Sequence, residues 1–283
     1  LSQAKPWEIW ESIALARIIA SVQQGKTTPL VVGSSSLLLH GVQGWTSNPN
    51  VELYQPKRRT SQLIPPCRCG TISVPAALRV YRRTPPITSE RTQVSGMLTE
   101  HPYDALIRCA MHDDVLQAFT LGCSALHKWS GFSNFSQDLC RGRAEVIRKT
   151  LLSRLERAKG RRGFARARRI LSAIDPGCSN PAEAALAWVV RALCPYNFST
   201  QYELSAGGRR FLPTLRFRSA NSLSSSMESR SWVQRKENST TPNARGFNVN
   251  RHYKSWAGIS FESTGWISTI GMSCADGLAM RSG

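Results

Sequence analysis

Basic residues are concentrated in one stretch of the chain, residues 141–174. It holds twelve Lys and Arg residues against two acidic ones, Glu145 and Glu156, and so carries +10 of the formal net charge of +19. Side chains of this kind bind phosphate groups through charge and hydrogen bonding. The stretch predicts a surface that binds phosphates or an acidic partner. The alternative interpretation is a solvated helical face in a basic protein.

Two helices are expected to position these basic side chains. Apolar residues recur at helical spacing from Ile147 to Ala158 and again from Ala167 to Ile174. Gly160 and Gly163 interrupt the pattern, because glycine disfavours a helix interior by roughly 1 kcal/mol relative to alanine. A basic helical hairpin is therefore predicted. The residues expected to contact nucleic acid are Arg161, Arg162, Arg166, Arg168, Arg169, Arg148 and Lys149.

Bulk composition narrows the class of protein. At 283 residues and 41% apolar content, the chain can build one large or two ordinary domains. Its pI of 10.4 makes nucleic acid the leading partner class. No apolar run reaches the roughly 18 residues of a membrane helix, and no signal-peptide pattern is present, so we expect a cytoplasmic protein without a membrane partner. The eight scattered cysteines are expected to be reduced and mostly buried.

The N-terminal part predicts helices and a small antiparallel sheet. A helix is expected over residues 7–23, with its buried face at Ile9, Ile13, Ala16, Ile19 and Ala20. An apolar segment at 30–32 precedes a second helix at 36–40. This pair is either a remnant of a helix-turn-helix or, as we favour, ordinary packing. Short β-rich stretches follow at 50–84, and residues 102–130 predict two helices that pack on that sheet.

Two further patterns bear on chemistry. His101, His112 and His127 accompany aspartates, but no HxH or HxxxH spacing supports a metal site, so solvent-facing histidines are favoured. Residues 181–194 predict a largely buried helix, with Pro181 in its first turn and Asn180 or Ser179 as its cap. Glu183 lies near the start of this helix. β-like segments follow in FSTQYEL and RRFLPTLRF.

The order of these pieces resembles a known family. LLLHGVQGW, NPNVELYQPKRR, RVYRRTPP, RRGFARARRILSAIDPGCSNPAEAALAWVVRAL and TQYEL together are similar to bacterial AbiEi-type antitoxins or transcriptional regulators that end in a domain like the very-short-patch-repair endonucleases. The resemblance covers roughly residues 15–211 and implies DNA and a cognate toxin as partners. Such proteins usually open with a winged helix-turn-helix, for which the preceding sequence is too short.

The resemblance implies a C-terminal fold of the PD-(D/E)XK nuclease type. In that fold a helix Glu, matched by Glu183, joins acidic strand residues that hold Mg²⁺, which polarises phosphate and activates water. The chain after Phe211 is instead rich in Ser, Asn and Arg, and only Glu228 and Glu237 are acidic up to residue 250. Glu183 would be a remnant, and we expect no cofactor for the chain as written. A lone Glu at a helix start more often stabilises the helix dipole.

Our hypothesis for the missing strands is a change of reading frame near residues 211–213. If the third base of each codon from Leu212 to Val233 is joined to the first two of the next, permissible codons spell TDFAIPERKLVVEFDGIEKLG. From Ser255 to Ser268 they allow LGWNLIRVNWMDL. Residues 213–283 are therefore predicted to be an irregular, out-of-frame tail, and the alternative is a natural disordered tail. Stop codons in the second frame of the encoding DNA would exclude the frame change.

Together these patterns predict an α/β (α+β) chain in four parts. They are an N-terminal α+β antitoxin-like region (1–135), the basic helical hairpin (136–178), a truncated restriction-endonuclease-like domain (179–212) and the tail (213–283). The predicted function is a nucleic-acid-associated antitoxin-like or regulatory protein with an inactive nuclease-like domain. The alternatives are a metal-dependent DNA endonuclease and a non-functional truncated product.

Overall fold

A computed structural model of the protein describes residues 5–24, 28–57, 60–193, 198–201, 204–206, 209–211 and 215–217. The chain divides into two compact units, residues 1–225 and 226–283, and every described residue belongs to the first. The predicted out-of-frame tail at 213–283 lies outside the described residues, apart from the short strand at 215–217.

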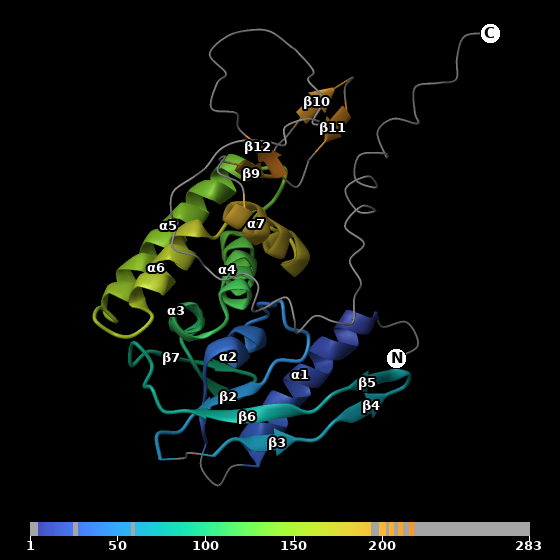
Figure 1. Ribbon diagram of the computed structural model, residues 1–283, viewed down its shortest axis with the longest axis vertical. Helices are drawn as coiled ribbons and strands as arrows, with labels where there is room; N and C mark the ends of the chain where they lie inside the picture. Colours follow the sequence, from blue (N-terminus) through green and yellow to red (C-terminus); the bar gives the residue numbers. More distant parts are fainter. Residues whose placement is uncertain are drawn as a thin grey trace, which may run out of the picture. The chain divides into compact units, whose positions relative to one another are not determined.

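The first half of the chain builds a mixed sheet (Figure 1). Its strand order is β3-β6-β2-β1-β8-β7, in which β2 pairs with β6 and β1 with β8 in parallel, while the other neighbours are antiparallel. The strands are β1 (Leu30–Val31), β2 (Val51–Tyr54), β3 (Gln62–Ile64), β6 (Ala77–Arg82), β7 (Arg91–Val94) and β8 (Met97–Glu100). The strands predicted at 50–84 are present, and two of them, Cys67–Cys69 and Ile72–Val74, form a small antiparallel sheet, but the others belong to this mixed sheet. Strands from both sides of that range extend the sheet, and parallel pairs make it mixed.

Two helices of the N-terminal part, α1 (Pro6–Gln23) and α2 (Gly33–Leu39), contribute to the sheet's core. The existence of α1 was predicted, but its buried face was not: Ala14, Arg17, Ile18 and Ser21 are buried, while Ile19 is 38% exposed. The Arg17 guanidinium explains the difference, because it donates to the carbonyl oxygens of Pro65 and Pro75 beneath the helix. Strand β1 lies between α1 and α2, so a helix-turn-helix with its short turn is not formed here.

Five helices follow the sheet in residues 102–193, a range that the structure describes in full (Figure 1): α3 (Pro102–His112), α4 (Val115–Ser130), α5 (Gln137–Glu156), α6 (Phe164–Ala173) and α7 (Pro181–Leu193). Helix α4 contacts α3, α5, α6 and α7 and so lies at the centre of this group. One apolar core joins residues from Leu37 to Ala187, and a second, smaller one joins α1 and α2 to the sheet. The helices predicted at 102–130, 141–175 and 181–194 are confirmed.

One prediction about exposure needs correction, and the prediction that the cysteines are mostly buried is confirmed for the described ones. Helix α7 buries Ala184, Ala185 and Ala187, but Leu186 is 44% and Leu193 74% exposed, so the helix is not largely buried. The described cysteines are free thiols, of which Cys109, Cys123, Cys140 and Cys178 are buried and Cys67 is exposed.

The remaining described strands form three short antiparallel pairs: β4 (Cys67–Cys69) with β5 (Ile72–Val74), β10 (Leu204–Ala206) with β11 (Arg209–Phe211), and β9 (Phe198–Thr200) with β12 (Leu215–Phe217).

Candidate functional site

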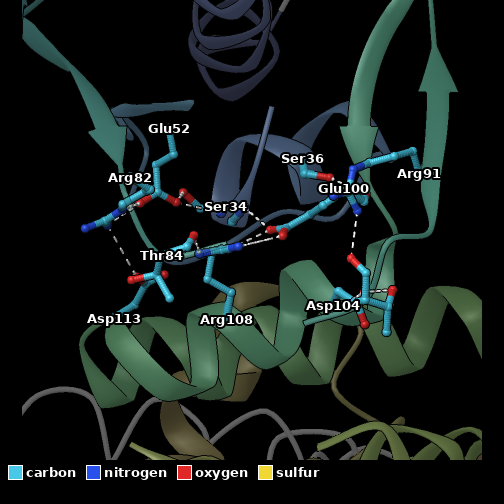
Figure 2. Close-up of polar contacts among 12 residues, drawn as sticks. Ser34, Ser36, Glu52, Arg82, Thr84, Arg91, Glu100, Asp104, Arg108 and Asp113 are labelled. Atoms are coloured by element: carbon cyan, nitrogen blue, oxygen red, sulfur yellow. Dashed lines mark hydrogen bonds and ion pairs between the residues drawn. The ribbon is translucent and has the colours of Figure 1, made fainter. Parts of the chain in front are cut away.

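Two buried carboxylates meet at the N-terminus of α2 (Figure 2). The Gly33 N–H donates to Glu100 Oε1 at 2.6 Å, and the Ser34 N–H donates to Glu52 Oε2 at 2.9 Å. The first N–H groups of a helix have no partner within it and carry partial positive charge, so acidic side chains are favoured there. Glycine is required at position 33, since φ is +59° and a Cβ atom would lie 2.1 Å from Glu52 Oε2.

An arginine neutralises each of these carboxylates. Arg108 on α3 donates through Nε and Nη2 to both oxygens of Glu100, at 3.0 to 3.2 Å, and through Nη1 to the Thr84 carbonyl at 3.1 Å. Both side chains are buried, so this is a desolvated ion pair with two parallel hydrogen bonds. Burial nevertheless raises the pKa of Glu100. Arg82 at the end of β6 donates through Nε and Nη2 to a single oxygen of Glu52, Oε1, and its side chain is 39% exposed.

Asp113, just after α3, completes what we call the carboxylate cluster: Glu52, Arg82 and Asp113. The Arg82 Nη2 atom lies 3.9 Å from Asp113 Oδ1. Burial, followed by the negative charge of Glu52, raises the pKa of Asp113 from 3.8 to about 7. Burial also raises the pKa of the Cys109 thiol well above its ordinary value. A polar pocket of about 180 Å³ opens beside the cluster, lined by Ser34, Thr46, Asn48, Pro49, Asn50, Glu52, Arg82, Asp113 and Gln117.

Two residues of the cluster, together with Cys109, offer atoms that could hold a metal ion. A carboxylate oxygen of Glu52, one of Asp113 and the Cys109 sulfur lie within 4.8 Å of one another. However, Glu52 already accepts hydrogen bonds from Arg82 and Ser34, and the thiol would have to lose a proton that burial makes it hold tightly. The residues therefore do not fit a bound cation unless Arg82 is displaced.

The Asp113→Asn variant is expected to reduce the pH dependence of stability. The folded chain binds the Asp113 proton more tightly than the unfolded chain does, so the contribution of this group is fully present below a pH near 3.8 and is lost as pH rises through about 7. Urea denaturation across this range should give a free energy of unfolding that falls less steeply with pH in the variant. Other titrating groups are shared by both proteins, so equal slopes would contradict the assignment.

Arg154 connects the basic hairpin, α5 with α6, to the rest of the described chain. Its Nε donates to Asp104 Oδ1 at 3.1 Å, and its Nη2 donates to Glu90. Asp104 is fully buried on α3 and also accepts from Thr88. This arginine therefore neutralises an internal carboxylate and is not available to a partner.

The seven predicted phosphate contacts fall into three groups. Arg148 donates to Glu145 and to the Ile174 carbonyl, and Arg166 donates to the Ala110 carbonyl at 3.2 Å, so both have internal partners. Arg168 is 63% exposed and lies 3.7 Å from Glu156, a surface ion pair of small energy. The remaining four are exposed: Lys149, Arg161, Arg162 and Arg169.

Glu183 serves the start of α7. Its Oε2 accepts hydrogen bonds from the Ser179 N–H and hydroxyl, both at 2.8 Å, and its own N–H donates to Asn180 Oδ1 at 2.9 Å. These contacts form a reciprocal cap that satisfies donors at the helix start. Among the described residues no second carboxylate joins Glu183 in a metal-binding group.

The histidines also have structural partners. His101 Nδ1 accepts from the Tyr103 N–H and so caps α3, and His127 Nδ1 lies 2.8 Å from the Pro176 carbonyl. His112 is exposed. The prediction that all three face solvent was therefore wrong for His101 and His127, which are partly buried. Within the described residues, none of them belongs to a group able to hold a metal.

Sequence reasoning missed the carboxylate cluster. The available signal for the cluster was Glu52 inside the segment Val51-Glu52-Leu53-Tyr54, and Glu100, which pairs with Arg108, likewise ends the strand Met97–Glu100. Acidic side chains are rarely buried unless they are paired. Their partners could not be read from the chain, because Glu52 and Arg82 are 30 residues apart.

Comparisons of the chain with known protein families, curated proteins and solved structures gave no match. Over the described residues, no helix is both long enough and apolar enough to cross a membrane.

Proposed function

We propose that the protein is a nucleic-acid-associated regulatory protein of the antitoxin-like type, which binds DNA phosphates through the basic hairpin and acts in the cytoplasm. The observation that carries this proposal is the charge of residues 157–169, which include seven Lys or Arg residues and no acidic residue. Arg161, Arg162 and Arg169 are exposed within this range. The resemblance to AbiEi-type antitoxins supports the same class and implies a cognate toxin.

The exposed arginines suit phosphate binding for a physical reason. Arginine presents planar N–H donors that match the oxygens of a phosphate group, and it keeps its charge at any physiological pH. Neutralising DNA phosphates also releases bound counterions, which drives association. Arg154 and Arg166 hold the hairpin to its neighbours, and Arg148 joins its two helices. These contacts leave the connecting turn and the exposed side of α6 to meet a ligand.

A nuclease activity finds less support. The carboxylate of Glu183 is engaged by Ser179, and the strands that the resemblance implies would complete a metal site lie beyond the described residues. We therefore propose that the truncated nuclease-like domain is inactive in this chain. Mg²⁺-dependent cleavage of DNA by the purified polypeptide would contradict this part of the proposal.

Arg161→Ala with Arg162→Ala is expected to weaken DNA binding and its dependence on salt. Each lost phosphate contact should reduce the slope of log K against log salt concentration by about 0.9. Fluorescence anisotropy with a labelled DNA duplex, at several salt concentrations, measures this slope.

The matched control is the double variant Lys57→Ala with Arg68→Ala, which removes the same charge from exposed positions outside the hairpin. It should retain the wild-type slope. Absence of any wild-type complex at low salt would exclude the proposal. An equal loss in both double variants would show that only the overall charge matters.

A further inference from the structure

Helix α5 has an exposed apolar face on the side opposite to its buried one. Leu139 is 65% and Val146 66% exposed, and Phe135, just before the helix, is 91% exposed. Gly142 lies between them, and a Cβ atom there would meet nothing within 4 Å. Leu139, Gly142 and Val146 are spaced by three and four residues, so they form one stripe along the helix, and Phe135 precedes its first residue, Gln137. We call it the α5 stripe.

The stripe differs from the apolar residues that any protein surface carries. Single exposed apolar side chains are ordinary, whereas contiguous ones mark interaction sites. The opposite face of α5 already buries Cys140, Ala144, Leu151 and Leu155 in the core, so the helix is apolar on two sides. Nucleic acid does not suit the stripe, because its side chains provide no donor for a phosphate group.

We propose that the α5 stripe binds the α5 stripe of a second copy of this chain, with the two helices antiparallel. The charges beside the stripe favour this occupant. Asp138 lies at the N-terminal end and Lys149 eleven residues later, and both are exposed. When Leu139 faces Val146 of the partner subunit, Asp138 lies near Lys149 of the partner subunit, and the two-fold symmetry produces this pair twice.

Two further properties of α5 agree with self-association. Gly142 falls near the two-fold axis, where the absence of a side chain lets the two helix backbones approach closely. Antiparallel helices also bring the positive N-terminal end of one beside the negative C-terminal end of the other. The apolar contact of Leu139 and Val146 supplies the main driving force, and the charge pairs determine the orientation.

Sedimentation equilibrium of the full chain, in the absence of nucleic acid, tests the proposal. The wild-type chain is expected to dimerise, and Val146→Glu should raise the dimer dissociation constant by at least about tenfold, as for a central interface residue. Leu63→Glu is the matched control, because Leu63 is 70% exposed on β3, outside the stripe. It should leave the dissociation constant unchanged. Unfolding curves of both variants verify that they remain folded.

A charge exchange tests the orientation separately. Asp138→Lys should weaken the dimer, and adding Lys149→Asp should restore it, which a loss of folding could not do. A wild-type chain that stays monomeric over the accessible concentrations would overturn the proposal, as would equal effects of Val146→Glu and Leu63→Glu. Because no DNA is present, either result leaves the proposed nucleic-acid binding to be judged on its own measurement.

Discussion

The Arg108→Met variant should lose about 3–5 kcal/mol of folding free energy, the cost of leaving one member of a buried ion pair alone. Glu100 is fully buried and would lose three donated hydrogen-bond contacts, two from Nε and one from Nη2. The Glu100 carboxylate would then keep one hydrogen-bond donor, the backbone N–H of Gly33 at the start of α2. Urea denaturation of the wild type and the variant measures the difference.

The cost should also depend on pH. Burial already raises the pKa of Glu100, and removing the Arg108 charge raises it further. A carboxyl whose folded pKa exceeds its unfolded value loses stabilisation as pH rises, so the defect of Arg108→Met should be larger at neutral than at acidic pH.

Two variants show whether the buried charge is the cause. Arg108→Met with Glu100→Gln removes both charges and should recover part of the stability, because an amide is less costly to bury than a carboxylate. Arg82→Met should cost less than Arg108→Met, since Arg82 is 39% exposed and water can replace part of its role. A loss below about 1 kcal/mol in Arg108→Met would contradict the importance of this pair.

Gly163→Ala is expected to be the most damaging alanine substitution in the basic hairpin. Gly163 has φ of +92°, and a Cβ atom would lie 2.3 Å from the carbonyl oxygen of Met111. The left-handed backbone costs a non-glycine residue roughly 1–2 kcal/mol, and crowding against a fixed backbone adds about 1–3 kcal/mol. We therefore expect a loss of about 2–5 kcal/mol in the free energy of unfolding.

Gly160→Ala is a matched control within the same turn. Gly160 has φ of +83°, but a Cβ atom there would meet nothing within 4 Å. It should lose only the backbone term of roughly 1–2 kcal/mol. Thermal or urea denaturation of the two variants separates crowding from backbone strain. Equal losses would show that α3 does not press against this turn.

The sequence predicted the helices well because their apolar residues recur at helical spacing. The basic hairpin and α7 are examples: glycines and a capping sequence mark their ends, and these signals are local. The buried face of α1 was missed because Arg17, a polar residue, lies in the interior through hydrogen bonds to Pro65 and Pro75. A pattern of apolar residues cannot show where a buried arginine finds its partners.

The sheet and the carboxylate cluster were harder to predict from the sequence for a related reason. β1 contains only Leu30 and Val31, and it is central because β2 and β8 pair with it from distant parts of the chain. Strand pairing of this kind depends on the tertiary fold more than on local preference. The members of the cluster come from β2, β6 and the residue after α3, and α2 donates to it through Ser34, so the arrangement appears only when these elements are assembled.

The pairing of Glu100 with Arg108 and Gly33 also has a consequence for synthesis on the ribosome. Gly33 and Glu100 are 67 residues apart, and Arg108 follows Glu100 by eight. The N-terminus of the chain leaves the ribosome first. Strand β8, which ends at Glu100, therefore emerges before Arg108, the residue that neutralises Glu100. The nascent sheet should therefore remain incompletely folded until α3 has left the exit tunnel. Fragments that end before Arg108 should fail to form the folded sheet.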